Sequence, residues 1–175
     1  MQLSEALKEH ARLLLDSNLG SSQEVNLRRA VSAAYYAVFH LLSAEVARQM
    51  SPEYPKGLRG RTQRALGHPE MAKAAGHFLH AGELAKDHGI PGDVGPLAPV
   101  SMNLARVAGS FRDLQQARYI ADYDVLDKGK VVNYVWASEY VAKAEQLFLD
   151  WKDVQGTDNA KVFLAALMLA GKWAK

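Results

Sequence analysis

The sequence predicts an all-α protein: an antiparallel up-and-down four-helix bundle with additional short helices and a C-terminal helix, in a single domain over residues 1–175. Three observations indicate this class. Apolar residues recur at steps of three and four along most of the chain, and no stretch alternates with the period of two of a half-buried strand. The hydrophobic content of 49% is ample for one continuous core, and without cysteine that core must hold the fold by itself.

Two long helices are predicted in the first fifty residues. The leucines that share one face of the first helix are Leu3, Leu7 and Leu14. They predict a helix over about 3–16. Ser21 and Glu24 have the spacing of a capping box, which would start a second helix that reaches about residue 50. Residues 33–42 in its middle are apolar nearly all round, so we expect this helix to be central and covered on several sides.

The chain between residues 51 and 99 is predicted to be less regular. Residues 51–57 hold two prolines and a glycine and form a connection. Pro69 suits the first turn of a short helix that runs to about His80, because proline lacks the N–H group that stays unpaired there. Residues 81–99 are rich in glycine and proline, so we expect a mobile loop without chemistry.

Three helices are predicted after residue 100. The apolar seam of the first consists of Leu104, Val107, Phe111 and Leu114. The next positions on that seam are Arg118 and Ala121. After a turn around 124–129, the same rhythm recurs in a second long helix, at Tyr134, Ala137, Val141, Ala144, Phe148 and Trp151. A last helix is predicted over about 158–174.

Charge and hydropathy limit the function classes. The net charge of +2 argues against a protein that coats polyanions, but residues 48–73 carry six bases and two acids, a net +4 that could meet phosphates. The N-terminus is charged where a signal peptide is apolar, and the apolar run of residues 30–44 is shorter than the roughly 20 residues that span a bilayer. We therefore expect a cytoplasmic protein that does not enter a membrane.

Arg118 is the most informative charged residue. It continues an apolar seam, so its guanidinium starts from a core-facing position, where a charge needs a partner. Asp122, four residues on, lies on the same helix face and can accept from it. Two interpretations follow: an Arg118–Asp122 ion pair that locks the helix end or a dimer seam, or an arginine that points into a cleft where a phosphate binds.

Other residues join Arg118 as candidates for binding RNA or phosphate. The full predicted set is Tyr36, His40, Arg112 and Arg118. His40 lies on the central helix and could approach the helix of Arg118, although a buried histidine satisfied by a neighbour is the commoner arrangement. Aromatic side chains that could stack on bases are Tyr35, Tyr36, Trp136 and Trp151. At helical spacing such residues usually belong to the core, so we retain only Tyr36.

No metal site or cofactor is predicted. His77 and His80 lie three residues apart with Glu70 or Glu83 nearby, but a pair without a fixed third ligand is more often an unliganded surface pair. The sequence also lacks a glycine-rich phosphate loop, a nucleophilic serine in a turn motif and a clustered carboxylate pair. These absences leave no basis for a kinase, an NTPase or a hydrolase of those types.

Two segments of the chain together resemble a known family. The matching residues are the run RRAVSAAYYAVFH at 28–40 and the later Arg118, Ala121, Asp122 and Tyr123, followed by an alanine-rich helix. This pattern looks like the HEPN domain of small stand-alone prokaryotic proteins. The resemblance covers about residues 22–151 and leaves residues 152–175 as a C-terminal helical extension.

The resemblance implies a homodimer, often formed through the helix with the motif, and a metal-independent ribonuclease of toxin–antitoxin, CRISPR or other defence systems. In the family's logic an arginine holds the scissile phosphate, and a histidine four to six residues later transfers the proton. Arg118, Asp122 and Tyr123 are the catalytic candidates on that basis. Tyr123 occupies the histidine position, and a phenol with a pKa of about 10 is a poor general base at neutral pH. Arg61 and His68 also have the arginine–histidine spacing, but they lie outside the motif helix, and we interpret that match as accidental.

The leading hypothesis is therefore a HEPN-type homodimer that binds RNA or nucleotide phosphate at Arg118, with RNA cleavage as an open question. The alternative is a non-catalytic interaction module in which Arg118 is taken up by Asp122. A third hypothesis is a plain helical protein whose partner comes from a neighbouring gene, for example a nucleotidyltransferase-like antitoxin.

Overall fold

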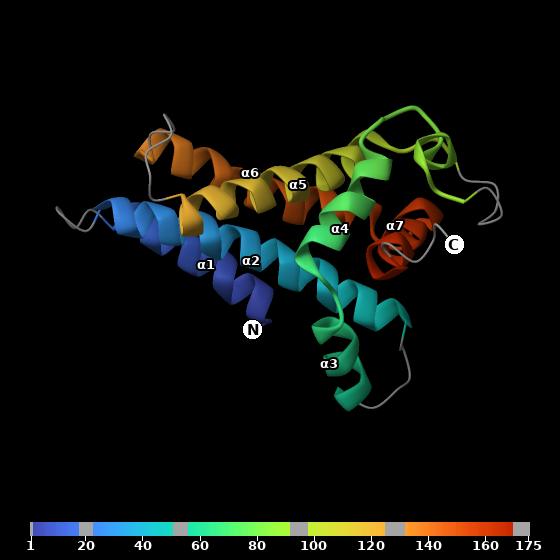
Figure 1. Ribbon diagram of the computed structural model, residues 1–175, viewed down its shortest axis with the longest axis horizontal. Coiled ribbons are helices and arrows are strands. Elements are labelled where there is room, and N and C mark those ends of the chain that lie inside the picture. The colour runs from blue at the N-terminus through green and yellow to red at the C-terminus, as the bar shows by residue number, and fades with distance from the viewer. Residues whose placement is uncertain (1, 18–22, 51–55, 92–97, 125–131, 170–175) are drawn as a thin grey trace.

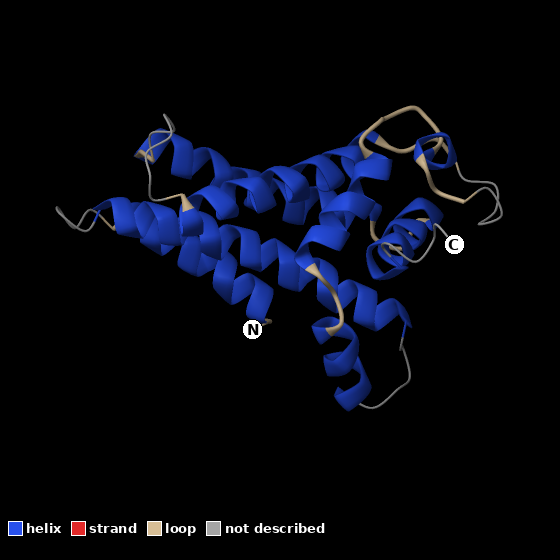
Figure 2. Ribbon diagram, viewed as in Figure 1, coloured by secondary structure: helices blue, strands red, loops and turns tan. Residues whose placement is uncertain are grey.

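The structure, a computed structural model, describes residues 2–17, 23–50, 56–91, 98–124 and 132–169 (Figure 1). Within these ranges it contains helices and no strand, which confirms the predicted all-α class (Figure 2). The α-helices are α1 (Leu3–Asp16), α2 (Gln23–Met50), α3 (Lys56–Arg64), α4 (His68–Ala75), α5 (Met102–Tyr123), α6 (Tyr134–Val154) and α7 (Asp158–Leu169). The predicted capping box at Ser21 and most of the predicted turn at 124–129 lie outside the described ranges.

The four long helices α1, α2, α5 and α6 lie alongside one another with alternating chain directions (Figure 1). α2 is central, as predicted, because it packs against α1, α5 and α6 and also contacts α3 and α7. Ala30, Ala34 and Ala37 on α2 are at most 1% exposed, so their small side chains let the neighbouring helices approach closely.

α2 is also the one described helix that is long and apolar enough to cross a membrane by length and composition. Its most apolar window has a mean hydropathy of 1.3, and 72% of that window is buried inside the bundle. The core helix of a bundle passes the same test, and a single such helix is weak evidence for a span. The expectation of no membrane insertion stays a prediction.

The segment between α3 and α5 differs in part from its prediction. α4 begins at His68 with Pro69 in its first turn, as predicted, but it ends at Ala75, and a single 3-10 turn over Gly76–Phe78 follows. The expected mobile loop at 81–99 is partly regular. Its described part contains a 3-10 turn at Ala85–His88 and is joined to the start of α5 by backbone hydrogen bonds between Gly82, Glu83 and Val100.

A small hydrophobic cluster closes the end of the bundle where α2, α5 and α6 meet. Its buried members are Leu27, Val31, Ala117, Ala121 and Ala137. Ser32 on α2 and Arg118 and Asp122 on α5 directly follow three of these buried residues in the chain, so they lie at the same end of the bundle. Ser32 is itself buried, whereas the side chains of Arg118 and Asp122 are partly exposed.

Candidate functional site

Four of the predicted residues come together between α2 and α5. Arg118 Nη2 donates hydrogen bonds to the hydroxyl oxygens of Tyr36, at 2.8 Å, and Tyr123, at 3.1 Å. Its guanidinium carbon lies 5.4 Å from the ring centre of Tyr36 and 5.0 Å from that of Tyr123, within the range of cation–π attraction. Two phenols from different helices therefore hold the arginine in place.

The predicted Arg118–Asp122 ion pair is present but incomplete. Arg118 Nε lies 2.7 Å from Asp122 Oδ2. The Nε–H bond is not directed at that oxygen, so buried Nε has no hydrogen-bond acceptor among the described residues. Because Nε is buried and Asp122 Oδ2 already lies beside it, an incoming anion would meet the exposed remainder of the guanidinium, on a side chain that is 20% exposed.

The surroundings of Arg118 keep it charged. Burial would lower the pKa of Arg118, but the nearby oxygens of Tyr36, Asp122 and Tyr123 outweigh it and raise that pKa above its ordinary value. The guanidinium and Asp122 are 20% and 24% exposed, so both are reachable from solvent. On the other side of the carboxylate, the Ser32 hydroxyl donates to Asp122 Oδ1, which ties α5 to α2.

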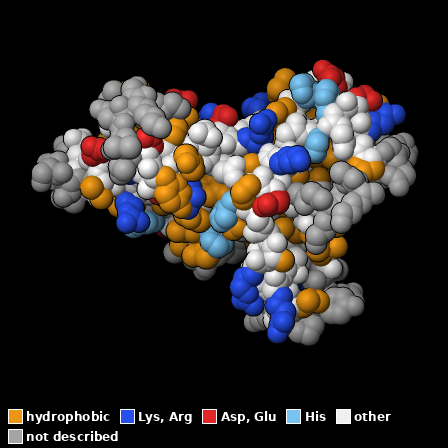
Figure 3. Space-filling view, viewed as in Figure 1, with side chains coloured by type: hydrophobic (Ala, Val, Ile, Leu, Met, Phe, Trp, Pro, Cys, Tyr) orange, Lys and Arg blue, Asp and Glu red, His pale blue; other side chains and the backbone are white. Residues whose placement is uncertain are grey.

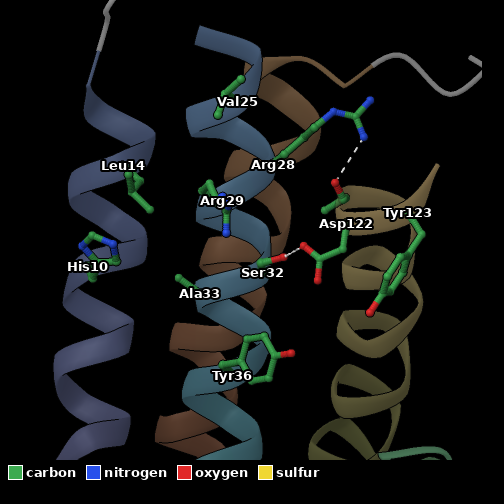
Figure 4. Close-up of a pocket in the computed structure, with 11 residues that line it drawn as sticks. His10, Leu14, Val25, Arg28, Arg29, Ser32, Ala33, Tyr36, Asp122 and Tyr123 are labelled. Carbon is green, nitrogen blue, oxygen red and sulfur yellow. Dashed lines mark hydrogen bonds between the residues drawn. The ribbon is translucent and has the colours of Figure 1, made fainter. Parts of the chain in front are cut away.

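A cavity of about 640 Å³ opens beside this cluster, between α1, α2 and the end of α5 (Figure 4). Its polar lining includes His10, Arg28, Arg29, Ser32, Tyr36, Asp122 and Tyr123. Arg118 does not line the cavity itself, but its three partners do. The volume lies within the roughly 300–1,000 Å³ range of small-ligand sites.

The two α2 arginines of the cavity play different parts, and sequence reasoning missed both. Arg28 donates to the backbone carbonyl oxygens of Ile120, Ala121 and Asp124, at 3.1, 3.2 and 3.1 Å, and so caps the C-terminal end of α5. Arg29 is exposed and makes no hydrogen bond or ion pair with a described residue. Within the described part of the chain, the Arg29 charge is therefore unpaired at the cavity. The doubled arginine ahead of the tyrosine pair was the sequence signal for it.

His68, which the sequence analysis named only in an accidental match with Arg61, contacts the same aromatic cluster. Its ring stacks on Phe39, with centroids 4.0 Å apart, and meets the ring of Tyr36 edge-on at 5.9 Å. Its Nδ1 is hydrogen-bonded to the Tyr35 hydroxyl at 2.5 Å. Burial, followed by the positive charges of Arg118 and His40, lowers the pKa of His68, while Glu70 raises it. The structure thus places an imidazole against the same tyrosine that holds Arg118.

The remaining phosphate-binding candidates lie elsewhere. His40 is one turn beyond Tyr36 on α2, next to a separate hollow of about 360 Å³ that α1 and α3 also line. Burial lowers the pKa of His40. Arg112 lies beside a third hollow of about 570 Å³, with Lys73 and Gln116. Part of the predicted basic stretch appears as arginine side chains on projecting α3, where Arg61 and Arg64 are exposed (Figure 3).

Among the described residues one group has side chains spaced like metal ligands, although the sequence predicted no metal site, and it includes His80 but not His77. His77 Nδ1 is bonded to the backbone carbonyl of His88, whereas the His80 ring stacks on the His88 ring at 3.9 Å. Glu83 bonds to His88 Nε2 at 2.6 Å, and the ligand atoms of His80, Glu83 and His88 lie within 4.8 Å of one another. This group is on the segment after α4, at the far end of the bundle from the C-terminal end of α5 (Figure 1).

Comparisons of the chain with protein-family models, with curated proteins and with solved structures found no match. The functional argument therefore depends on the geometry around Arg118, and membership of the HEPN family stays an expectation.

Proposed function

We propose that this protein binds single-stranded RNA, with a backbone phosphate held by Arg118. The observation that carries the proposal is a charged and partly exposed arginine that two phenols hold beside an open cavity. A guanidinium in this state can form charge-assisted, bidentate hydrogen bonds to a phosphate.

The charge of the cavity supports an anionic ligand. Arg28 and Arg29 line it, and Asp122 is the one acidic residue that does so among the described residues. Asp122 is already engaged by Ser32 and Arg118, whereas exposed Arg29 has no ion-pair partner within the described ranges. Several cations spaced along two helices suit a chain of phosphates better than a single carboxylate.

An aromatic surface beside the cations supports a nucleic-acid ligand in particular. Tyr123 is 57% exposed at the cavity edge, and Tyr119 is 59% exposed with its ring 5.4 Å from that of Tyr123. Exposed aromatic rings next to arginines are the usual platform on which unpaired bases stack. The HEPN resemblance adds the expectations of a homodimer and of a toxin–antitoxin or defence role in the cytoplasm, with a nucleotidyltransferase-like protein as one candidate partner.

The test compares arginine variants by fluorescence anisotropy with a labelled single-stranded RNA of about 12 nucleotides. We expect Arg118→Ala to weaken binding roughly ten- to hundredfold, because hydrogen bonds between charged groups contribute about 1.5–3 kcal/mol. Arg118→Lys should give an intermediate loss of RNA affinity, since lysine keeps the positive charge but lacks the planar guanidinium that binds a phosphate through two hydrogen bonds. Affinity should fall as salt rises, less steeply for Arg118→Ala than for the wild type.

Arg12→Ala is the matched control. Arg12 is an exposed α1 arginine that pairs with Glu145 on α6, and it does not line the cavity. Arg12→Ala removes one positive charge, as Arg118→Ala does. The RNA affinity of the Arg12→Ala variant should nevertheless stay near that of the wild type. Equal affinities for the wild type, Arg118→Ala and Arg29→Ala would refute the proposal.

A non-catalytic interaction module is the second candidate function, and exposed apolar side chains favour it. At the C-terminal end of α5 and the start of α6, Tyr119, Tyr134 and Val135 are 59%, 49% and 72% exposed. Such surface is typical of interaction sites. This candidate predicts no RNA affinity but a stable complex with a co-expressed neighbouring gene product.

A further inference from the structure

We propose that His80, Glu83 and His88 bind a divalent transition-metal ion, with Zn²⁺ as the ion that fits the ligand set, on the segment between α4 and α5. The ligand atoms of the three side chains lie within 4.8 Å of one another. This segment is at the far end of the bundle from the C-terminal end of α5 (Figure 1). The inference is therefore independent of the proposed RNA binding at Arg118.

The chemistry of the three side chains selects the ion. Imidazole nitrogens suit zinc, copper and nickel, whereas calcium and magnesium prefer oxygen ligands alone. Two histidines and one glutamate form a ligand set that zinc accepts in tetrahedral geometry, with the fourth position left for water. His80 and Glu83 are exposed, so that fourth position faces solvent. Histidine and acidic side chains lie together on the surface over this segment (Figure 3).

Two of the three ligands already meet. His88 Nε2 donates a hydrogen bond to Glu83 Oε2, and the two atoms are 2.6 Å apart. In a zinc site each of these atoms lies about 2.0–2.2 Å from the ion, so they would move apart by less than about 1 Å. The ion takes the place of the proton between them. Because the Glu83 side chain is 57% exposed, this movement disturbs no packing.

The His80 ring supplies the third ligand after a rotation. It stacks on the His88 ring with centroids 3.9 Å apart and planes 13° from parallel. A nitrogen lone pair points along its ring plane, and one ion cannot lie in the planes of two parallel rings at once. Zinc binding therefore requires the His80 ring to tilt out of the stack. The tilt breaks no hydrogen bond with a described residue, and His80 is exposed to solvent.

The backbone that carries the ligands is anchored. Gly82 donates to the carbonyl oxygen of Val100 at 2.9 Å, and Val100 donates to that of Glu83 at 2.8 Å, which ties the segment to the residues before α5. Ala85 and Ile90, which are 0% and 2% exposed, hold the segment to the core. Ligands on an anchored backbone lose less conformational freedom when they bind than ligands on a free loop.

A third histidine fixes the backbone at His88. His77 Nδ1 is hydrogen-bonded to the carbonyl oxygen of His88, and His77 is outside the ligand group. Gly89 has a φ of +103°, and a Cβ at that position would lie 2.9 Å from the His77 ring. Glycine thus permits the close approach of His77 that holds residue 88. The two histidines of the site are therefore His80 and His88, and not the His77–His80 pair that sequence spacing suggests.

The bound ion would have a structural role. It joins residues 80, 83 and 88, so it closes the segment that leads from α4 toward α5. An ion that binds only the folded arrangement of its ligands stabilises that arrangement. Backbone amides of residues 82–90 should therefore exchange hydrogen more slowly when zinc is bound.

The test is a titration of the purified full chain, freed of any histidine tag, with zinc chloride, followed by calorimetry and by NMR of the histidine side chains. We expect one Zn²⁺ per chain and shifts in the imidazole signals of His80 and His88, out of the six histidines in the sequence. His80→Ala and Glu83→Gln should each weaken zinc affinity by at least about tenfold. Both side chains are exposed, so these variants should fold like the wild type. Mg²⁺ and Ca²⁺ at the same concentrations should leave the imidazole signals in place.

Asp87→Asn is the matched control. Asp87 is an exposed carboxylate in the same 3-10 turn and is outside the ligand group, so this variant changes the net charge as Glu83→Gln does. Its zinc affinity should differ from that of the wild type by less than about fivefold, the limit expected for an exposed charge.

Three results would overturn the site. They are a wild type that binds no zinc, a zinc affinity that is the same in the wild type, His80→Ala and Glu83→Gln, and NMR shifts confined to other histidines. None of them bears on RNA binding by Arg118, which has its own test.

Discussion

Helix α5 carries two arginines that each meet an aspartate, and the two pairs are built differently. Arg106 donates from Nε and Nη2 to the two oxygens of Asp150 on α6, at 2.9 and 2.8 Å. Asp150 is only 3% exposed, and Gln146 donates to it as well, at 3.0 Å. Arg118 meets Asp122 on its own helix through a single 2.7 Å contact without a directed hydrogen bond.

The difference indicates which pair is structural and which is available to a ligand. Every oxygen of Asp150 is engaged, and the fork joins two helices of the bundle, so this pair acts as a clamp. The hydrogen bond from Arg106 lowers the pKa of Asp150, against the opposing effect of burial. Arg118, by contrast, contacts a single carboxylate oxygen on its own helix and lies beside a cavity that its partners line.

The largest expected effect on stability comes from breaking the clamp. Asp150→Asn keeps the shape of the side chain but removes the charge that Arg106 and Gln146 bind, so it should lower the free energy of unfolding by about 1–3 kcal/mol. RNA affinity should be unchanged, because Asp150 takes no part in the Arg118 cavity. Urea denaturation monitored by circular dichroism measures the first quantity and fluorescence anisotropy the second. If Asp150→Asn lowered the free energy of unfolding less than Asp122→Asn, the Arg118–Asp122 pair and not the clamp would be the structural one.

The pH dependence of the clamp sharpens the same contrast. The pKa of Asp150 is lower in the folded protein than the ordinary 3.8, so the unfolded chain binds the proton more tightly. Its stabilising contribution is therefore complete above about pH 4 and is lost as the pH falls from 3.8 through the folded pKa. The stability difference between the wild type and Asp150→Asn should shrink over that window. Urea denaturation at pH 7, 5 and 3.5 tests this, and a constant difference would show that the charge of Asp150 is not what stabilises the clamp.

The two ion pairs also differ in whether the sequence could predict them, because one is local in the chain and the other is not. Helical periodicity is local, so it placed the long helices, the central position of α2 and the i, i+4 pair of Arg118 and Asp122. The clamp joins residues 44 positions apart, and His68 meets Tyr36 only because the start of α4 returns the chain to α2. Neither contact can be predicted from the spacing of apolar residues, because both depend on how the segments between the helices bring distant parts of the chain together.

The regularity of the described part of 81–99 was missed for a related reason. Glycine and proline there suggested an irregular loop, but Gly89, with a φ of +103°, ends a short 3-10 turn in a conformation that other residues rarely adopt. Buried Ala85 and Ile90 anchor that turn in the core. Composition indicated the turn, and only tertiary packing revealed that it is fixed.

The smallest expected effect concerns the pair that is open to ligand. Asp122→Asn removes the negative charge that competes with phosphate for Arg118, while the amide oxygen can still accept from Ser32. RNA affinity should therefore rise, by up to about fivefold, which corresponds to less than about 1 kcal/mol. The free energy of unfolding should change by less than about 1 kcal/mol, since the pair is partly exposed. Fluorescence anisotropy titrations with RNA measure this change. Asp113→Asn is the control for net charge, because Asp113 is an exposed α5 carboxylate that pairs with Lys143. Weaker RNA binding by Asp122→Asn alone would mean that the carboxylate orients Arg118 for the ligand rather than competing with it.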